Sequence, residues 1–362
     1  MVLEVSVLPY CRRCGTKLDD SARFCHKCGT PVLTFATAAP AKPSRPLRKE
    51  PLVIAAIVLI AILVAAVILT AIVFAPFSPI SFNQTNQDSH SSINTLNLNF
   101  QANTAQVTLI AQNINNQNIL IQTSANGSRS IFGSNNPIEV TFTNQTEGNT
   151  LTVNSKVTEA NEFPTAGNLH VTCTIYVNPA LKLNINVTTQ AGSITLIAEN
   201  SATFQSINLH ANAGEVQANL QNATIAGDVS LNTQAGTVNF GLRQASLQGN
   251  QTVTLHSNAG SVSMDITQTK TLQGNLQVNA VTELGSINVA LQIDGDVGAK
   301  IISQTNLGSM HLNVQHFSGN QSPIQSDNYP AASNIEISSR TNLGSINIDA
   351  SYQSLNGPSL RN

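Results

Sequence analysis

A short segment centred on a glycine recurs seven times in the second half of this chain. It reads Thr, Ser or Ala, then Gln, Asn or Glu, then Ala or Leu, Gly, a small or acidic residue, and Ile, Val or Met. The intervals between the glycines are 22, 22, 24, 25, 23 and 36 residues, and the seven positions are Gly192, Gly214, Gly236, Gly260, Gly285, Gly308 and Gly344. Recurrence at a nearly constant interval is the signature of a repeat architecture, so it constrains the fold more than any other feature.

Apolar residues alternate with polar ones on both sides of each glycine. Val229 and Leu231 precede Gly236, and Ile287 and Val289 follow Gly285. A period of two on both sides predicts strand, tight turn, strand. An interval of about 23 residues suits one coil of a β-solenoid, or β-helix, with coils about 4.8 Å apart, whereas propeller blades need about 40 or more residues. The predicted fold class is therefore an all-β domain built as a solenoid.

Stacked coils would place equivalent side chains above one another. Glycine at all seven corners predicts a backbone turn with positive φ that other residues adopt only with strain. A hydroxyl ladder is predicted from Thr189, Thr233, Ser257, Thr282, Thr305 and Thr341. An amide ladder, with hydrogen bonds along the stack, is predicted from Gln190, Asn212, Gln234, Asn258, Asn306 and Asn342.

Strands are also predicted before the repeats, over residues 92–188, where apolar residues alternate without the glycine column. An open terminal coil would expose unpaired backbone groups that promote aggregation, so we expect these strands to form a β cap. Within the long interval before Gly344, residues 316–333 read as an inserted loop. Cys173 alternates with Thr172 and Thr174, which predicts a small apolar side chain in the β core. An intermolecular disulfide at Cys173 is the alternative.

Four of the five cysteines lie close together near the N-terminus, as CxxC-x10-CxxC: Cys11, Cys14, Cys25 and Cys28. Each CxxC supplies two thiolates from one turn, and the glycine that follows permits positive φ. Four soft ligands close a tetrahedral shell, which predicts a structural Zn²⁺ rather than a catalytic one. His26 could replace one ligand, and iron is an alternative metal, although rubredoxin-like sites have wider spacing between the pairs.

The residues YCRRCGTKLDDSARFCHKCGT resemble the short zinc ribbons at the ends of many prokaryotic, especially archaeal, membrane proteins. The resemblance implies a structural or partner-docking module. Basic residues here could favour nucleic acid or anionic lipid, but a solvated surface explains them as well, and we predict no nucleic-acid partner.

From Leu52 to Phe74 the chain has no charged residue and a single Thr. An apolar run of this length predicts a transmembrane helix in contact with membrane lipid. A cleavable signal peptide would have a shorter apolar region nearer the start of the chain. Lys42, Arg45, Arg48 and Lys49 precede the run, and the next Lys or Arg is Arg129. The positive-inside rule therefore predicts a single-pass protein of the cell membrane with a cytoplasmic N-terminus and an extracellular C-terminal domain.

The predicted domains follow from these features. They are a zinc ribbon (1–30), a Pro-rich basic linker (31–51), the transmembrane helix (52–74), an extracellular linker (75–91), the β cap (92–188), the solenoid repeats (189–351) and a C-terminal tail (352–362).

The stretch LHVTCTIYVNPALKLNINVTTQAGSITL resembles the entry to the repetitive domain of the putative-adhesin β-solenoid family of prokaryotic surface proteins. The resemblance covers roughly residues 92–350 and implies adhesion. This chain departs from the family by carrying Ser or Thr where members often have an acidic residue after the glycine. No functional residue is carried across from the family.

Seven Asn-x-Ser/Thr sequons, all beyond the apolar run, make the β domain a candidate glycoprotein. They are Asn83, Asn126, Asn144, Asn186, Asn222, Asn250 and Asn320.

No sequence motif for catalysis is present: the chain lacks a nucleophile elbow, HExxH and a phosphate-binding loop. The histidines after residue 80 show no mutual spacing. Asp294 and Asp296 could act as a carboxylate pair or bind calcium, but they read first as turn residues. Only 10% of the residues are charged. We therefore predict a non-enzymatic surface protein that binds an extracellular protein or glycan, with the ribbon docking a cytoplasmic partner. The alternative is a carbohydrate-active solenoid enzyme.

Overall fold

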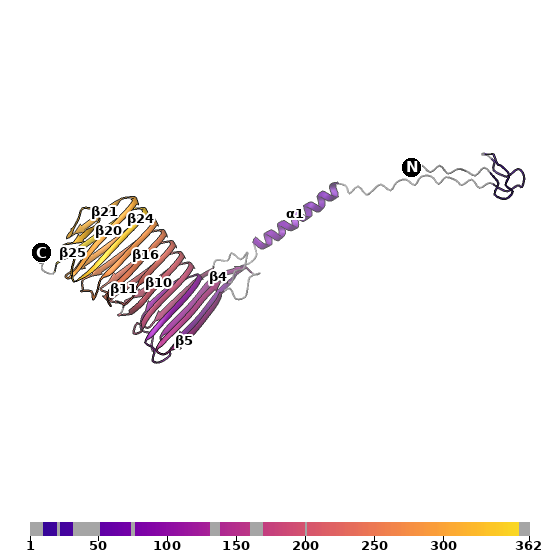
Figure 1. Cartoon of the computed structure of the whole chain (residues 1–362). Coiled ribbons are helices and arrows are strands. Elements are labelled where there is room, and N and C mark those ends of the chain that lie inside the picture. The colour runs from indigo at the N-terminus through magenta and orange to yellow at the C-terminus, as the bar shows by residue number, and fades with distance from the viewer. Residues whose placement is uncertain are drawn as a thin grey trace. The chain divides into compact units, whose positions relative to one another are not determined.

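The computed structural model of the chain describes residues 10–19, 22–31, 51–73, 77–130, 138–159, 169–199 and 201–354. The chain divides into two compact units, Met1–Phe74 and Ala75–Asn362. Residues 32–50, with the predicted basic linker, and residues 355–362 of the predicted tail lie outside the described residues. Figure 1 shows the helix of the first unit and the sheets of the second.

Helix α1 (Pro51–Val73) forms in the apolar run. Its side chains are described over residues 56–68 and at Thr70, and all of these are exposed. Within the residues that the structure describes, no helix is both long and apolar enough to cross a membrane. This finding corrects the prediction of a transmembrane helix over residues 52–74. It also corrects the single-pass localisation and the assignment of the two ends to opposite sides of a membrane.

The described strands of the second unit form two sheets, and one hydrophobic core contains residues from both. In order across the 11-stranded sheet the strands are β1 (Phe77–Asp88), β4 (Ile119–Ser130), β7 (Leu169–Val177), β3 (Gln106–Ala111), β9 (Ile194–Ala198), β11 (Val216–Gln221), β14 (Val238–Arg243), β17 (Val262–Gln268), β19 (Ile287–Asp294), β25 (Ile346–Gln353) and β21 (Met310–Gln315).

In order across the 14-stranded sheet the strands are β22 (Phe317–Ser318), β23 (Ile324–Ser326), β20 (Val297–Leu307), β24 (Ser333–Leu343), β18 (Leu276–Leu284), β16 (Gln251–Ala259), β13 (Val229–Ala235), β10 (Thr203–Ala213), β8 (Lys182–Ala191), β2 (Thr95–Thr104), β6 (Thr150–Glu159) and β5 (Ile138–Glu147). Two short strands complete this sheet: β12 (Thr224–Ile225) pairs with β10, and β15 (Ser246–Leu247) pairs with β12.

Each repeat contributes one strand to each sheet, with its glycine at the corner between them. Neighbouring repeats pair in parallel and in register, so that Val238 lies opposite Val262 and Leu231 opposite Leu255. All four side chains are fully buried between the sheets. Alternation along each strand therefore sends one row of side chains into the core and the next row to the outer face.

The glycine corners are confirmed. Gly236 and Gly260 have φ of 152° and 146°, within the left-handed range that favours glycine. A Cβ built on Gly260 would lie 1.8 Å from the carbonyl oxygen of Gly236, so the corners are also stacked too closely for any side chain. Six of the seven repeat glycines have positive φ; Gly308 is the exception.

The strand order corrects the predicted fold class. Strands β24 and β25, which form the last repeat along the chain, lie between β18 and β20 in one sheet and between β19 and β21 in the other. A solenoid stacks each coil on its neighbour along the chain. The predicted β-solenoid is therefore wrong, and the domain is a pair of mixed sheets whose strands depart from chain order.

The strands predicted over residues 92–188 as a β cap extend the same two sheets. Strand β2 pairs in parallel with β8, and β3 with β9, so residues before the repeats continue both layers. Antiparallel strands β1, β4 and β5 complete this end. Cys173, on β7, is 1% exposed and is a free thiol, which confirms its predicted place in the core.

The predicted inserted loop contains a small antiparallel hairpin. Strands β22 and β23 pair with each other, and β23 pairs with the edge of β20. Ile324 on β23 is 1% exposed, so the insertion adds to the core at this end of the 14-stranded sheet.

Candidate metal centre

Two copies of one eight-residue turn hold the four N-terminal cysteines. The copies, YCRRCGTK from Tyr10 and FCHKCGTP from Phe24, share Cys, Cys, Gly and Thr at equivalent positions. In the first, the amide of Cys11 donates to the Thr16 carbonyl at 2.8 Å, and the amide of Gly15 donates to the Cys11 carbonyl at 2.9 Å. The second repeats both bonds with equivalent residues, Cys25 with Thr30 at 2.9 Å and Gly29 with Cys25 at 2.8 Å.

Glycine closes each turn for a conformational reason. Gly15 and Gly29 have φ of 67° and 68°, and no neighbouring atom lies within 4 Å of where a Cβ would stand. The requirement is therefore for backbone geometry and not for space. An antiparallel bridge closes each copy, between Tyr10 and Lys17 in the first and between Phe24 and Pro31 in the second.

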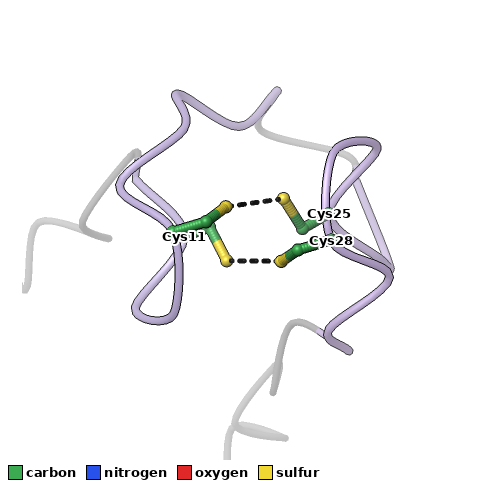
Figure 2. Close-up of side chains that lie close together, drawn as sticks. Cys11, Cys25 and Cys28 are labelled. Carbon is green, nitrogen blue, oxygen red and sulfur yellow. Dashed lines mark hydrogen bonds between the residues drawn. The ribbon is translucent and has the colours of Figure 1, made fainter.

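The two turns bring all four sulfur atoms together. Cys11 Sγ lies 3.6 Å from Cys28 Sγ, and Cys14 Sγ lies 3.6 Å from Cys25 Sγ. Figure 2 shows Cys11 facing Cys25 and Cys28 across the site. The four ligand atoms lie within 4.8 Å of one another. A tetrahedral zinc ion with bonds of about 2.3 Å needs sulfur atoms roughly 3.8 Å apart, so the residues fit the metal.

Hydroxyl groups next to the sulfurs favour the thiolate form. The Thr30 hydroxyl lies 3.2 Å from Cys28 Sγ and, together with the Thr30 backbone, Cys14 and Cys25, lowers the pKa of Cys28 to about 6. The Thr16 hydroxyl, at the same distance from Cys14 Sγ, lowers the pKa of Cys14. Zinc binds the thiolate, so these contacts prepare the ligands for the metal.

The arrangement suits a structural metal. Cys11 and Cys25 are buried, and four thiolates fill a tetrahedral shell with no position for a substrate. His26, the alternative ligand, is exposed and is not part of the ligand group. The ribbon residues predicted as ligands are therefore all brought together, and the centre would hold its metal for folding.

The predicted glycosylation residues lie in different environments. Asn83, Asn126, Asn144, Asn222, Asn250 and Asn320 are exposed. Asn186 is half-buried on β8, where it donates to Asn99 and accepts from Asn208 on the neighbouring strands. A glycan on Asn186 would therefore have to break an amide ladder, and modification of the other six remains a prediction.

Asp294 and Asp296 flank Gly295 in the turn between β19 and β20. Gly295 has φ of 64°, which fits a tight turn. Among the described residues, the four cysteines form the one group of three or more potential metal ligands, and neither aspartate joins such a group.

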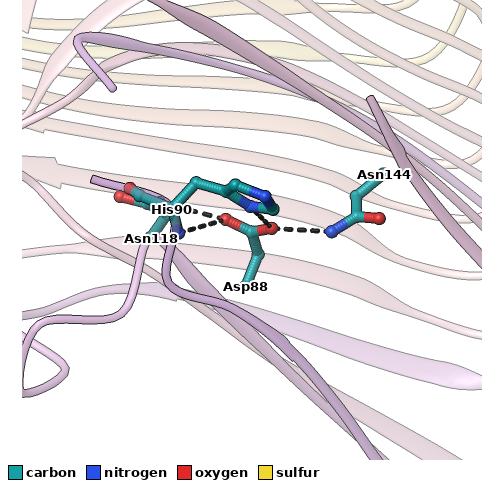
Figure 3. A network of polar contacts seen from close by, with 4 residues as sticks. All are labelled: Asp88, His90, Asn118 and Asn144. Atoms are coloured by element: carbon teal, nitrogen blue, oxygen red, sulfur yellow. Dashed lines mark hydrogen bonds and ion pairs between the residues drawn. The ribbon is translucent and has the colours of Figure 1, made fainter. Parts of the chain in front are cut away.

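A polar cluster that sequence analysis missed centres on Asp88, at the end of β1. Its side chain is 1% exposed and accepts hydrogen bonds from Asn118 at 3.0 Å and from Asn144 at 2.6 Å. His90 Nδ1 lies 2.6 Å from the same carboxylate, and Figure 3 shows the three partners around it. Burial would raise the pKa of Asp88, but hydrogen bonds from Asn118, His90 and Asn144 outweigh it and lower that pKa. The carboxylate ties strands of both sheets together.

Comparison with known proteins identifies the segment that holds the four cysteines. A zinc-ribbon domain family matches residues 10–32, so this segment is a zinc ribbon whose four cysteines are positioned to bind a structural zinc ion. No curated protein sequence matches the chain.

Solved structures resemble the chain only distantly. They include a "putative cell adhesion protein" from Clostridium sporogenes (11% identity, TM-score 0.35, covering 75% of this chain and 100% of that one) and a "putative adhesin" from Bacteroides fragilis (15%, 0.32, 75% and 97%). A third is a "putative lipid binding protein" from Parabacteroides distasonis (14%, 0.27, 76% and 98%).

Proposed function

We propose that this chain is a binding protein without catalytic activity, in which the β domain supplies the recognition surface. The observation that carries the proposal is the fixed array of side-chain amides on the outer faces of the sheets. On β2, β8 and β10, Asn208 donates to Asn186 at 2.9 Å, and Asn186 donates to Asn99 at 3.3 Å. On the other sheet, Asn347 donates to Asn288 at 2.8 Å.

An array of this kind suits recognition of an extended ligand. Each amide offers both a donor and an acceptor, and its neighbour on the next strand fixes its orientation. Side chains that are already ordered lose less conformational entropy when a ligand binds. A polymer lying across the strands would meet the same groups at each strand.

Carboxylates on these faces are held in ways that favour recognition over proton transfer. Asp265 Oδ2 accepts a hydrogen bond from Arg243 at 2.9 Å, and Asp349 Oδ1 accepts one from Asn313 at 3.3 Å. A carboxylate with one oxygen already paired presents its remaining lone pairs in a fixed direction, which supports a binding role over a carbohydrate-active enzyme.

The zinc ribbon has the surface of a docking module for a protein partner. Tyr10 and Phe24 occupy equivalent positions in the two turns, and their side chains are 54% and 63% exposed. Arg12 and Lys27 are exposed beside them. Exposed aromatic and basic side chains on a small rigid scaffold are typical of protein interfaces.

The test is to screen the purified full chain on immobilised glycans and proteins while assaying the same glycans for new reducing ends. Saturable binding without turnover supports the proposal. Release of reducing ends that grows with time would overturn it in favour of an enzyme.

A further inference from the structure

Two adjoining hollows lie on the outer face of the 11-stranded sheet. One extends from β9 to β17, the other from β17 to β21, and each has a volume of about 420 Å³. Ser263 and Asp265 on β17 line both. The hollows therefore meet at β17 and form one groove that runs across the strands.

Small residues in one register row create the groove. Across β11, β14, β17, β19, β25 and β21 this row reads Asn219, Gly241, Asp265, Ala290, Asp349 and Asn313. Gly241 and Ala290 each lie beside longer polar residues, so the floor drops at β14 and β19. A Cβ on Gly241 would stand 2.8 Å from Asn219 Oδ1, so any side chain at this position would displace the Asn219 amide as it entered the hollow.

Amides and carboxylates line the groove. Asn239 and Asn288 come from the row beside the floor, and Glu199, Asp265 and Asp349 bring three carboxylates against the single guanidinium of Arg243. Asp265 and Arg243 form an ion pair across the first hollow, with both side chains more than half exposed. The first hollow is mainly polar, the second is more apolar, and the groove carries a net negative charge.

We propose that this groove binds an uncharged polysaccharide chain lying across the strands, an inference that rests on the proposed binding function. Amide and carboxylate side chains are suited to sugar hydroxyls, because together they supply donors and paired acceptors. The excess of carboxylates disfavours acidic polymers, since like charges repel. The two low points are two strands apart, roughly 9.6 Å, so a repeating chain would place equivalent sugars over Gly241 and Ala290.

A peptide fits this groove less well. Peptides that bind to sheets do so by adding a strand at an edge through backbone hydrogen bonds. The groove lies on the face of β11, β14, β17, β19 and β25, each of which is paired on both sides. Recognition here depends on side chains.

Calorimetry with the full chain tests the proposal, using hexasaccharides of β-1,4-linked glucose, mannose and N-acetylglucosamine, with oligogalacturonate as the acidic comparison. Gly241→Gln places a long side chain in the first hollow, and the backbone of Gly241 has no positive φ that would strain the new residue. Thr254→Gln, an exposed residue on the outer face of β16 in the other sheet, is the matched control. Asp265→Asn removes a groove carboxylate, with exposed Asp228→Asn as its control.

We expect one of the neutral hexasaccharides to bind, with affinity falling about tenfold or more in the Gly241 and Asp265 variants, as expected when hydrogen bonds are lost, and unchanged in both controls. Binding that these two variants leave unchanged would overturn the groove while leaving the proposed binding function in place. Preference for oligogalacturonate, or no binding to any neutral hexasaccharide, would overturn the ligand class.

Discussion

Thr282 donates its hydroxyl hydrogen to the carbonyl oxygen of Gly260, one repeat away, at 2.7 Å. The same bond recurs along the stack, where Thr233 donates to Gly214 at 3.0 Å and Ser257 to Gly236 at 2.9 Å. Thr341 donates to Gly285 and Thr305 to Gly344, both at 2.9 Å. The hydroxyl residue that begins one repeat therefore donates to the glycine carbonyl of the neighbouring repeat. The hydroxyl column and the glycine column of the sequence are thus joined by hydrogen bonds.

Replacing Thr282 with Val should destabilise the domain. The side chain is 1% exposed, so the substitution keeps its shape but leaves the Gly260 carbonyl without this donor. Loss of one partner from a buried hydrogen bond costs about 1–3 kcal/mol. Urea unfolding of the full chain measures the change, and Thr282→Ser, which keeps the hydroxyl, is the control. Equal stability of the Val variant and the parent would show that the ladder contributes nothing.

Alanine at Gly260 should be far more damaging than alanine at Gly249. Both glycines have positive φ, 146° and 84°. At Gly260 the new Cβ would also lie 1.8 Å from a backbone oxygen, whereas at Gly249 no atom lies within 4 Å. The Gly249 variant should lose only about 1–3 kcal/mol from backbone strain. In the Gly260 variant, hydrogen exchange should rise first in strands β13, β14, β18 and β19 beside the corner. Similar losses in the two variants would mean that φ alone, and not close stacking, requires glycine.

Much of the repeat structure could be predicted because its columns are set by local geometry. A glycine followed by alternating apolar residues specifies the corner and the inward-facing row wherever it occurs, and Val238 and Val262 lie as that pattern requires. The metal centre could be predicted equally well from the sequence, since its four ligands and two glycines lie in a single short segment. In both cases the informative residues are close together in the sequence.

Strand order could not be predicted, because it depends on a choice among nearly identical partners. The segments around Gly285, Gly308 and Gly344 read TELGSI, TNLGSM and TNLGSI, so local sequence does not decide which one stacks on which. The corner at Ala105, next to Gly192 in the stack, lacks glycine and so gave no signal that strands before the repeats continue the same sheets. The Asp88 cluster was hidden as well, since its partners Asn118 and Asn144 lie 30 and 56 residues away.

Metal analysis of the full chain should find one zinc ion per chain. Cys14→Ser should abolish stoichiometric binding, because a thiolate is replaced by a neutral hydroxyl and the shell is left incomplete. His26→Ala, which removes an exposed side chain between two ligands, should retain the metal. Chelator should unfold residues 10–31 without changing the β domain, as judged by hydrogen exchange in the two segments. Stoichiometric zinc in the Cys14 variant, or its loss in the His26 variant, would show that the ligand set is wrong.

The Asp88 cluster should make one end of the β domain sensitive to acid. The carboxylate joins β1 to β5 through Asn144 and to the turn before β4 through Asn118. Hydrogen bonds hold its pKa below the ordinary value of 3.8. A group whose pKa is lower in the folded state stabilises that state above its unfolded pKa and loses this contribution as pH falls through the folded pKa. Protonation would also turn an acceptor into a donor opposite two amide groups that can only donate there.

Protection of β1 and β5 against hydrogen exchange, relative to the unfolded chain at the same pH, should therefore be high from neutral pH down to about pH 4. Below that pH it should fall steeply, before protection falls in the central strands. Among the described residues, His90 is the titratable group in contact with the carboxylate, and its side chain is 59% exposed. Asp88→Asn should expose β1 and β5 at neutral pH and remove the acid transition, because the substituted amide brings a donor into the cluster at every pH. Asp228→Asn, an exposed substitution, should leave the profile unchanged. Protection of β1 and β5 that is the same at pH 7 and at pH 3 would show that this carboxylate does not hold the end of the domain together.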